Sequence, residues 1–143
     1  LISGTAFADT QGAARVVDGD TIWIGKAKIR LHGIDTPEMK QTCESPSDAN
    51  VFCGRLAKQA LISIIGDLEV RCEQRDRDRY KRIVAVCYVG SLDINREMVV
   101  GGWALAYRKY SHDYIADEEA AQKRGAGLWG MQFIPPWEWR RQK

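Results

Sequence analysis

The sequence is poor in several kinds of residue, and each shortage excludes a class of protein. Its 143 residues include two histidines and four prolines, and 21 Lys and Arg residues nearly balance 19 Asp and Glu residues. A net charge of +2 is too small to indicate a polyanion partner through the overall field alone. No apolar run approaches the ~18 residues of a membrane span, so we expect no membrane partner for the mature chain. His32 and His112 lie in no recognisable pattern and are assigned no role.

The composition that remains is that of a globular protein. Hydrophobic residues make up 45% and charged residues 28%, which argues against a disordered chain, a collagen or a coiled coil. There is no internal repeat and no low-complexity linker, so we predict a single domain over residues 15–143, with a C-terminal extension from about residue 130.

The first eight residues end in Ala6-Phe7-Ala8, a small-x-small pattern typical of a signal-peptide cleavage site. We therefore expect residues 1–8 to be a signal-peptide remnant or a disordered N-terminus, and the protein to be secreted or periplasmic.

The four cysteines agree with an exported protein, because an even number in a short chain favours two disulfides. No Cys-x2-4-Cys pair is present, which argues against zinc. Cys72 and Cys87 lie in two β-rich runs that flank a charged turn near residues 79–80. If these runs pair in antiparallel fashion, Cys72 faces Cys87 and Cys43 is left to pair with Cys53.

The order of elements predicts an α+β fold. Strand-like segments cover residues 15–34, with turns at 18–20 and 25–26, and a polar loop follows from Pro37 to about residue 48. Helices are predicted at 49–65, 94–100 and 113–124. With the two cysteine runs the strands number about five. We therefore predict a five-stranded antiparallel OB-fold β-barrel with about three helices, although periodicity alone supports only an antiparallel α+β protein.

Two groups of carboxylates are candidates for a metal site. Asp18-Gly19-Asp20-Thr21 forms a turn between strands, and Arg30 precedes Asp35-Thr36-Pro37-Glu38 at the end of a later strand. If the strands fold back on each other, Asp20 lies beside Asp35, and two such carboxylates need a cation between them. Oxygen ligands favour calcium or magnesium. The alternatives are a structural role for Asp18 in the turn and a structural ion pair for Arg30.

A third group, Asp78-Arg79-Tyr80-Lys81-Arg82, lies at the predicted hairpin turn. A guanidinium matches phosphate oxygens with two parallel hydrogen bonds and stays charged, so Arg30 and Arg82 together could bind a phosphate.

These segments resemble, in order and spacing, the signature segments of the staphylococcal nuclease (thermonuclease) family. The resemblance rests on Val17 to Thr21, on Arg30 with Asp35 to Glu38, on Asp78 to Arg82, and on Asn95 through Gly102-Trp103-Ala104. It covers about residues 15–129. The cysteines and the C-terminal Pro135-Pro136-Trp137-Glu138-Trp139-Arg140-Arg141 segment look like additions of a secreted bacterial subgroup with disulfides.

The resemblance implies an OB-fold endonuclease that uses one calcium ion per chain to hydrolyse DNA and RNA to 3′-phosphate products. It implies metal ligands at Asp20, Asp35 and the Thr36 carbonyl, and catalytic roles for Glu38 beside the attacking water and for Arg30 and Arg82 at the phosphate.

The resemblance also implies a substrate-binding set, with departures from the family pattern. Tyr80 and Tyr110 match pocket tyrosines, Arg79 replaces a lysine, and Arg108 stands where we place the first pocket tyrosine. Lys81 replaces a glycine. We expect a monomer whose substrates are DNA and RNA. A catalytically silent OB module that binds nucleic acid or protein, and a phosphoesterase for small substrates, are the alternative functions.

Overall fold

The structure is a computed structural model that describes residues 9–142, so the predicted signal-peptide remnant at 1–8 lies outside the described residues. Its helices are α1 (Cys53–Ile65), α2 (Ile94–Val100), α3 (Ile115–Arg124) and α4 (Pro136–Arg141), with a 3-10 helix at Gly127–Gly130. Its strands are β1 (Thr10–Gly12), β2 (Ala14–Asp18), β3 (Thr21–Ile24), β4 (Ala27–Leu31), β5 (Ile34–Asp35), β6 (Cys43–Ser45), β7 (Asp48–Val51), β8 (Val70–Arg77), β9 (Ile83–Val89), β10 (Leu92–Asp93) and β11 (Leu105–Ala106).

The main sheet is curled but not closed. Its strand order is β1-β8-β9-β4-β3-β2, with β10 paired to β9, and its pairs are antiparallel except for β4 with β9. The α+β class is thus confirmed. The predicted five-stranded antiparallel barrel is not, because in the described residues this sheet has seven strands, one parallel pair and no closure. The two strands beyond the predicted five are β1, which pairs with β8, and β10, which pairs with β9.

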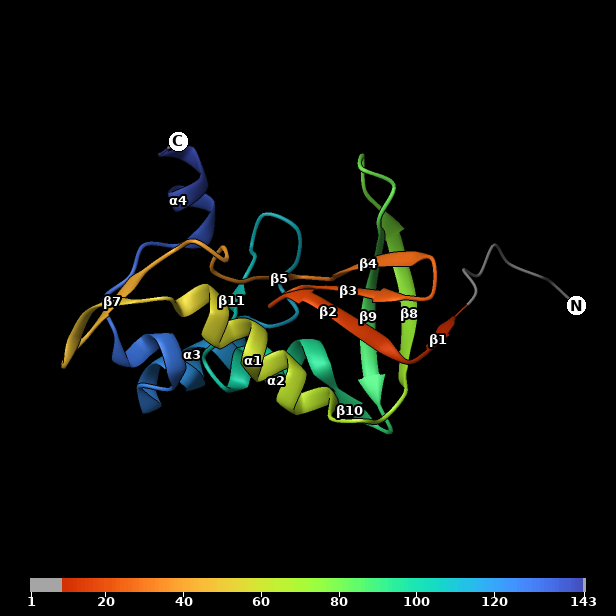
Figure 1. Cartoon of the computed structure of the whole chain (residues 1–143), viewed down its shortest axis with the longest axis horizontal. Helices are drawn as coiled ribbons and strands as arrows, with labels where there is room; N and C mark the ends of the chain where they lie inside the picture. Colours follow the sequence, from red (N-terminus) through yellow and green to blue (C-terminus); the bar gives the residue numbers. More distant parts are fainter. Residues whose placement is uncertain (1–8, 143) are drawn as a thin grey trace, which may run out of the picture.

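The helices α1 and α2 pack on the sheet, α1 against β2 and α2 against β9, and bury the main core between them (Figure 1). The bounds of α2 agree with the prediction, and the Asp93 carboxylate caps it by accepting from Arg96 N at 2.9 Å. Helix α3 begins at Ile115, two residues later than predicted, and ends as expected before Gly125 in the left-handed conformation.

The predicted start of the first helix at residue 49 is wrong. Residues 48–51 instead form β7, which pairs with β6 inside the segment predicted as a loop. Ser45 Oγ and the backbone of Asp48 exchange hydrogen bonds across the intervening turn, and this closes a hairpin where the helix was expected. The helix can begin only at Cys53, where the Cys43–Cys53 disulfide joins it to β6.

Both predicted disulfides are present. Cys72 and Cys87 are direct partners in the β8–β9 register and are bonded to each other, and Cys43 is bonded to Cys53. In residues 9–142 there is no helix with the length and apolar character that crossing a membrane requires.

Candidate functional site

The turn between β2 and β3 brings the first carboxylates to the site. Asp20 N donates to Asp18 Oδ1 at 3.1 Å, so Asp18 shapes the turn in which both residues lie. A side chain at Gly19 would place its Cβ 2.8 Å from Thr36 Oγ1 and 2.9 Å from Ala57 Cβ. The turn can therefore pack against Thr36 and α1 only because residue 19 is a glycine.

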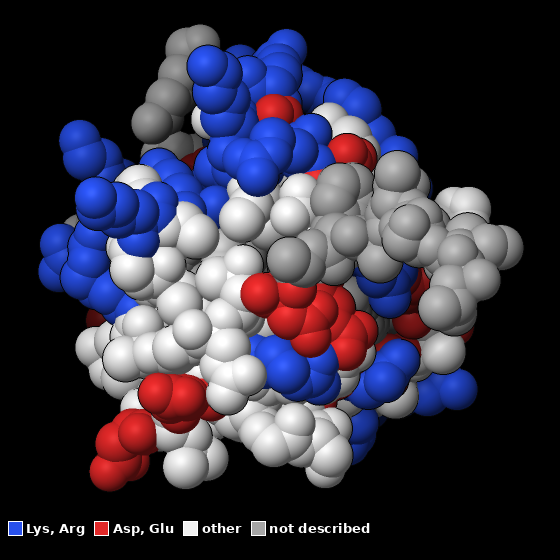
Figure 2. Space-filling view, turned by 90° about the vertical axis from the view of Figure 1, so that its right-hand side faces the viewer, with Lys and Arg blue, Asp and Glu red and all other residues white. Residues whose placement is uncertain are grey.

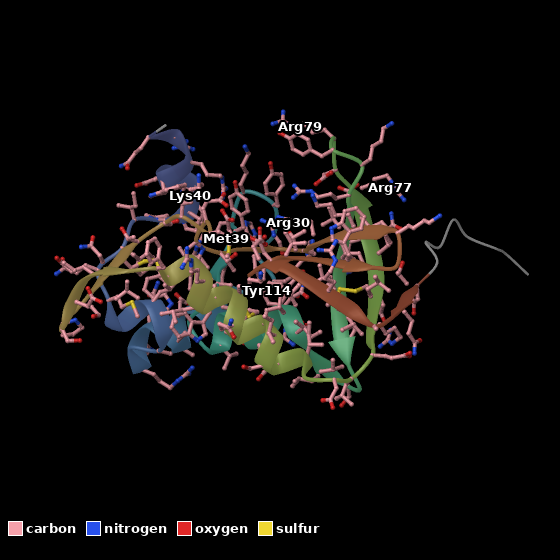
Figure 3. All side chains as sticks on the ribbon, viewed as in Figure 1. Arg30, Met39, Lys40, Arg77, Arg79 and Tyr114 are labelled. Atoms are coloured by element: carbon pink, nitrogen blue, oxygen red, sulfur yellow. A yellow bond between two sulfur atoms is a disulfide. The ribbon has the colours of Figure 1, made fainter. Side chains whose placement is uncertain are left out.

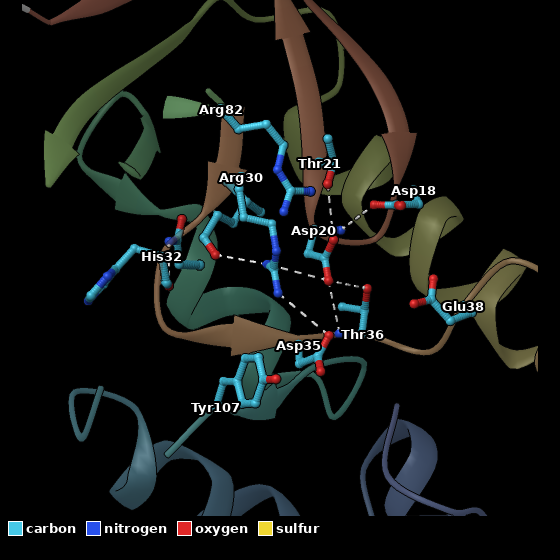
Figure 4. Close-up of polar contacts among 12 residues, drawn as sticks. Asp18, Asp20, Thr21, Arg30, His32, Asp35, Thr36, Glu38, Arg82 and Tyr107 are labelled. Atoms are coloured by element: carbon cyan, nitrogen blue, oxygen red, sulfur yellow. Dashed lines mark hydrogen bonds and ion pairs between the residues drawn. The ribbon is translucent and has the colours of Figure 1, made fainter. Parts of the chain in front are cut away.

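Asp20, Arg30 and Asp35 converge as the sequence predicted (Figure 4). Thr21 and Arg30 are register partners on β3 and β4, which places Arg30 beside the Asp20 turn. Arg30 Nη1 lies 3.4 Å from Asp20 Oδ2, and Arg30 Nη2 lies 3.5 Å from Asp35 Oδ1. Asp20 and Asp35 are buried, with 8% and 1% of their surface exposed. One guanidinium thus bridges two buried carboxylates.

Thr36 connects the two acidic segments. Its backbone N and its Oγ1 both donate to Asp20 Oδ2, at 3.1 and 3.0 Å, and Thr21 Oγ1 donates to Asp20 Oδ1 at 3.1 Å. These bonds orient the Asp20 carboxylate toward the segment that carries Asp35.

The three aspartates differ in their affinity for protons. Burial raises the pKa of Asp35 to about 6, with a further contribution from the charge of Asp20. Burial likewise raises the pKa of Asp18 to about 7, again helped by Asp20. Burial also acts to raise the pKa of Asp20, but the charge of Arg30 and hydrogen bonds from Asp18 and Thr36 outweigh it and hold that pKa below its usual value. Asp20 is therefore the member of the cluster that stays ionised most readily.

Two residues that the sequence interpretation missed complete the surroundings of Asp35. Tyr107 follows β11, and β11 pairs with β5 so that Leu105 faces Asp35. Arg140 of α4 reaches the same carboxylate, with Nη2 at 2.8 Å from Asp35 Oδ2, and lies 3.5 Å from the Tyr107 hydroxyl. The Ala106-Tyr107 pair after the glycine turn was the available signal for Tyr107, whereas Arg140 lies beyond residues 15–129, over which the sequence motifs were recognised.

Glu38 lies at the rim of the cluster. Its Oε1 is 3.1 Å from Arg140 Nη1, its backbone N donates to Gln41 Oε1 at 3.2 Å, and its side chain is 34% exposed. A carboxylate in this position can meet water while it remains next to Asp35.

Arg82 approaches the site from the β8–β9 hairpin. Arg30 pairs with Val84 in the parallel β4–β9 register, so Arg82, two residues earlier, lies on the same face as Arg30. Its Nε donates to Asp78 Oδ2 at 2.7 Å, and Asp78 Oδ1 accepts from the backbone N of Tyr80 and of Arg82, both at 2.9 Å. Asp78 therefore fixes both the turn and the guanidinium.

The tip of this hairpin is basic and aromatic. Tyr80 is 65% exposed, and Arg79 Nη2 donates to its hydroxyl at 3.0 Å. Lys81 has a φ of 66°, a left-handed backbone conformation that residues other than glycine adopt at some cost. Figure 3 shows Arg79 at the projecting tip, and Figure 2 shows Lys and Arg side chains gathered along the upper part of the adjoining face. The exposed cations of the hairpin are Arg75, Arg77, Arg79 and Lys81.

The remaining predicted substrate residues lie in two different surroundings. Tyr110 is 64% exposed and makes an edge contact with Tyr107, with ring centroids 5.0 Å apart. Arg108 instead pairs with Glu118 of α3 at 2.7 Å. The tyrosine next to the carboxylates is thus Tyr107, one residue before the position that the sequence interpretation selected.

The oxygen donors of the site suit a divalent ion. Within residues 9–142 no group of three or more His, Cys, Asp or Glu side chains is arranged to hold a metal. Asp20 and Asp35 nevertheless contribute two carboxylates that converge on one cation, Arg30, and Thr36 follows Asp35 directly. Two carboxylates and a carbonyl, completed by water, form a donor set that calcium and magnesium accept.

Comparison with known proteins identifies relatives that match most of the chain. The sequence model of the family described as "Staphylococcal nuclease homologue" matches residues 28–131. An "Uncharacterized endonuclease" of Haemophilus influenzae is 36% identical over 94% of this chain and 75% of its own length. A "Micrococcal nuclease" of Shigella flexneri is 32% identical over 99% of this chain and 86% of its own length. A protein with a different name, "Succinoglycan biosynthesis protein ExoI" of Rhizobium meliloti, is 34% identical over 85% of this chain and 65% of its own length.

Proposed function

The chain belongs to the staphylococcal nuclease family, and from this premise we propose that it is a calcium-dependent, sugar-non-specific endonuclease that hydrolyses DNA and RNA to 3′-phosphate products. The observation that carries the proposal is the convergence of Asp20, Asp35 and Arg30 from three separate segments. Nuclease-named relatives that match nearly the whole chain support the same reaction class.

The metal part of the proposal assigns Asp20, Asp35 and the Thr36 carbonyl as ligands of one calcium ion per chain. The hard oxygen donors and the closeness of two buried carboxylates to one cation, Arg30, support this assignment, because neighbouring carboxylates favour a cation between them and calcium prefers oxygen ligands. When bound there, a divalent ion would polarise a phosphate oxygen and make a neighbouring water more acidic.

The protein's own residues would perform the remaining work. Glu38, partly exposed beside Asp35, would orient the attacking water or accept its proton. Arg30 and Arg82 would donate to the non-bridging and leaving oxygens, where negative charge grows in the transition state. Because Asp78 engages Nε of Arg82, the proposal assigns the terminal Nη groups of Arg82 to the phosphate.

The hairpin tip and the Tyr107–Tyr110 pair would hold the nucleotides on either side of the reacting phosphate. The exposed rings of Tyr80 and Tyr110 offer stacking surfaces to bases, and Arg79 adds a positive charge beside Tyr80. Arg108 would act on this pocket only by leaving Glu118, so we assign the contact next to Asp35 to Tyr107.

The proposal includes a secreted or periplasmic monomer. Two disulfides support the compartment, because such bonds persist in oxidising surroundings.

Digestion of single-stranded DNA and RNA with calcium, with magnesium and with a chelator tests the proposal. We expect cleavage with calcium, none with chelator, and losses of about 10²–10³-fold in kcat for Arg82→Ala and Glu38→Ala. Lys123→Ala, which removes an exposed charge on α3, is the control and should retain full activity. Product ends should accept a polymerase only after phosphatase treatment. Cleavage that resists the chelator, or catalytic variants as active as wild type, would contradict the proposal.

A further inference from the structure

The C-terminal segment carries a guanidinium to the carboxylates of the site. Arg140 Nη2 lies 2.8 Å from Asp35 Oδ2 and Nη1 lies 3.2 Å from Asp35 Oδ1, so one guanidinium engages both oxygens of this carboxylate. The same Nη1 lies 3.1 Å from Glu38 Oε1. Arg140 therefore joins the proposed metal ligand Asp35 to Glu38, the residue proposed to act on water.

Contacts away from the carboxylates hold α4 in this position. Gln41, which is fully buried, donates from Nε2 to the Ile134 carbonyl at 2.8 Å, while its Oε1 accepts from the backbone N of Glu38. The Trp137 ring stacks on Tyr107 with centroids 5.3 Å apart and planes 6° apart. Trp137 also packs against a buried cluster that contains the Cys43–Cys53 disulfide. The position of Arg140 is thus set by contacts of the C-terminal segment with Gln41, with Tyr107 and with this buried cluster.

The two arginines together surround Asp35. Oδ1 faces Arg30 Nη2 at 3.5 Å and Arg140 Nη1 at 3.2 Å, and Oδ2 faces Arg140 Nη2. A carboxylate has about four acceptor positions, and the two guanidiniums already make three contacts with those of Asp35. A divalent ion therefore competes with Arg140 for these oxygens. The guanidinium also repels such an ion. For a single charge about 5 Å from a divalent ion, Coulomb's law gives roughly a tenfold effect on affinity even at the dielectric constant of water.

We propose that Arg140 is the counter-cation of the metal-free site, that a divalent ion displaces it from Asp35, and that it thereby sets the affinity of the site for metal. The inference rests on the proposed function, because it takes Asp20 and Asp35 as the metal ligands. The C-terminal Trp-Glu-Trp-Arg segment then controls metal binding, because the calcium concentration needed for activity depends on the contact between α4 and Asp35.

Calorimetric titration of calcium chloride into the metal-free protein, without nucleic acid, tests this role. Arg140→Ala and Arg140→Gln both remove the charge, and Gln retains part of the side-chain volume and a hydrogen-bond donor. We expect both to bind calcium about tenfold more tightly than wild type, while Arg140→Lys, which keeps the charge, stays within a fewfold of wild type. Arg141→Ala is the matched control, because it removes the neighbouring exposed charge from the same helix and should leave the affinity unchanged.

Thermal unfolding in chelator establishes that each variant is folded before the titration. Calcium affinity that is equal or weaker in Arg140→Ala and Arg140→Gln would overturn the inference, as would equal tightening in Arg141→Ala. Those two results would leave the proposed metal site standing. If wild type and all variants fail to bind calcium, the metal part of the proposed function and this inference fail together.

Discussion

Gly54→Ala is a substitution for which helix propensity and tertiary packing predict opposite results. Gly54 lies in the first turn of α1 and is buried. A Cβ at this position would lie 1.9 Å from the carbonyl oxygen of Glu38, 2.5 Å from its carbonyl carbon and 2.9 Å from Met39 Cα. All three are backbone atoms, so no side-chain rotation can relieve the contact. The absence of a side chain at residue 54 therefore sets how closely α1 approaches the segment that carries Glu38.

The magnitudes decide the outcome. Replacing glycine with alanine inside a helix normally stabilises it by about 0.5–1 kcal/mol. Forcing extra volume into a packed contact typically costs about 1–3 kcal/mol. To restore an ordinary contact distance, the Glu38 peptide must move by roughly 1 Å or more. A displacement of ~1 Å at a reacting group can lower the rate about 10²-fold. We expect Gly54→Ala to lose about 1–2 kcal/mol of unfolding free energy and about 10²-fold in kcat.

Urea unfolding and a single-stranded DNA digestion assay with calcium measure the two effects. Ser63→Ala, on the exposed side of α1, is the control for helix propensity and should be neutral or slightly stabilising with unchanged activity. A Gly54→Ala protein that is at least as stable and as active as wild type would refute the argument that this contact positions Glu38.

Three further predictions follow from the carboxylates and the disulfides. Because the pKa of Asp35 is raised to about 6, protons should compete with calcium below that pH, and calorimetry should show a steep fall in affinity there but not above about pH 7; a flat profile would argue against Asp35 as a ligand. The pKa of Asp18, raised to about 7, means that the folded state binds this proton more tightly than the unfolded chain. The stability that the protonated Asp18 gives to the folded state is therefore lost as the pH rises from about 4 to about 7. Asp18→Asn should raise the unfolding free energy of the metal-free protein at about pH 8, where the wild-type side chain is charged, but not at about pH 4. An equal effect at both pH values would refute this. Thiol titration of the unfolded, unreduced protein should find no free thiol, whereas two or more would disprove a disulfide.

Local patterns were sufficient to predict much of the fold. The β8–β9 hairpin could be recognised because two β-rich runs flank a charged turn, and this alone placed Cys72 opposite Cys87. The start of α1 could not be predicted in this way, because residues 48–51 are held in β7 by pairing with β6 and by the neighbouring disulfide. The number of strands could not be predicted either, because the short strands β1 and β10 depend on their pairing with β8 and β9.

The same distinction applies to the site. The approach of Asp20 and Asp35 to Arg30 was predictable from the turn, from the strand order and from the family motifs. Tyr107 was missed by one residue because the β5–β11 pairing, and not the spacing of the tyrosines, determines which ring lies next to Asp35. Arg140 is 105 residues away from Asp35 in the sequence, and its position depends on Gln41 and on the stacking of Trp137. No local pattern contains that information.

A crystal structure of the protein grown with calcium, with anomalous differences collected to locate the ion, would show whether Asp20 and Asp35 bind it. We expect one ion at about 2.3–2.6 Å from a carboxylate oxygen of Asp20, from one of Asp35 and from the Thr36 carbonyl, with Arg140 no longer paired to both oxygens of Asp35. An ion bound elsewhere, or these carboxylates bound only by Arg30 and Arg140 at saturating calcium, would contradict it.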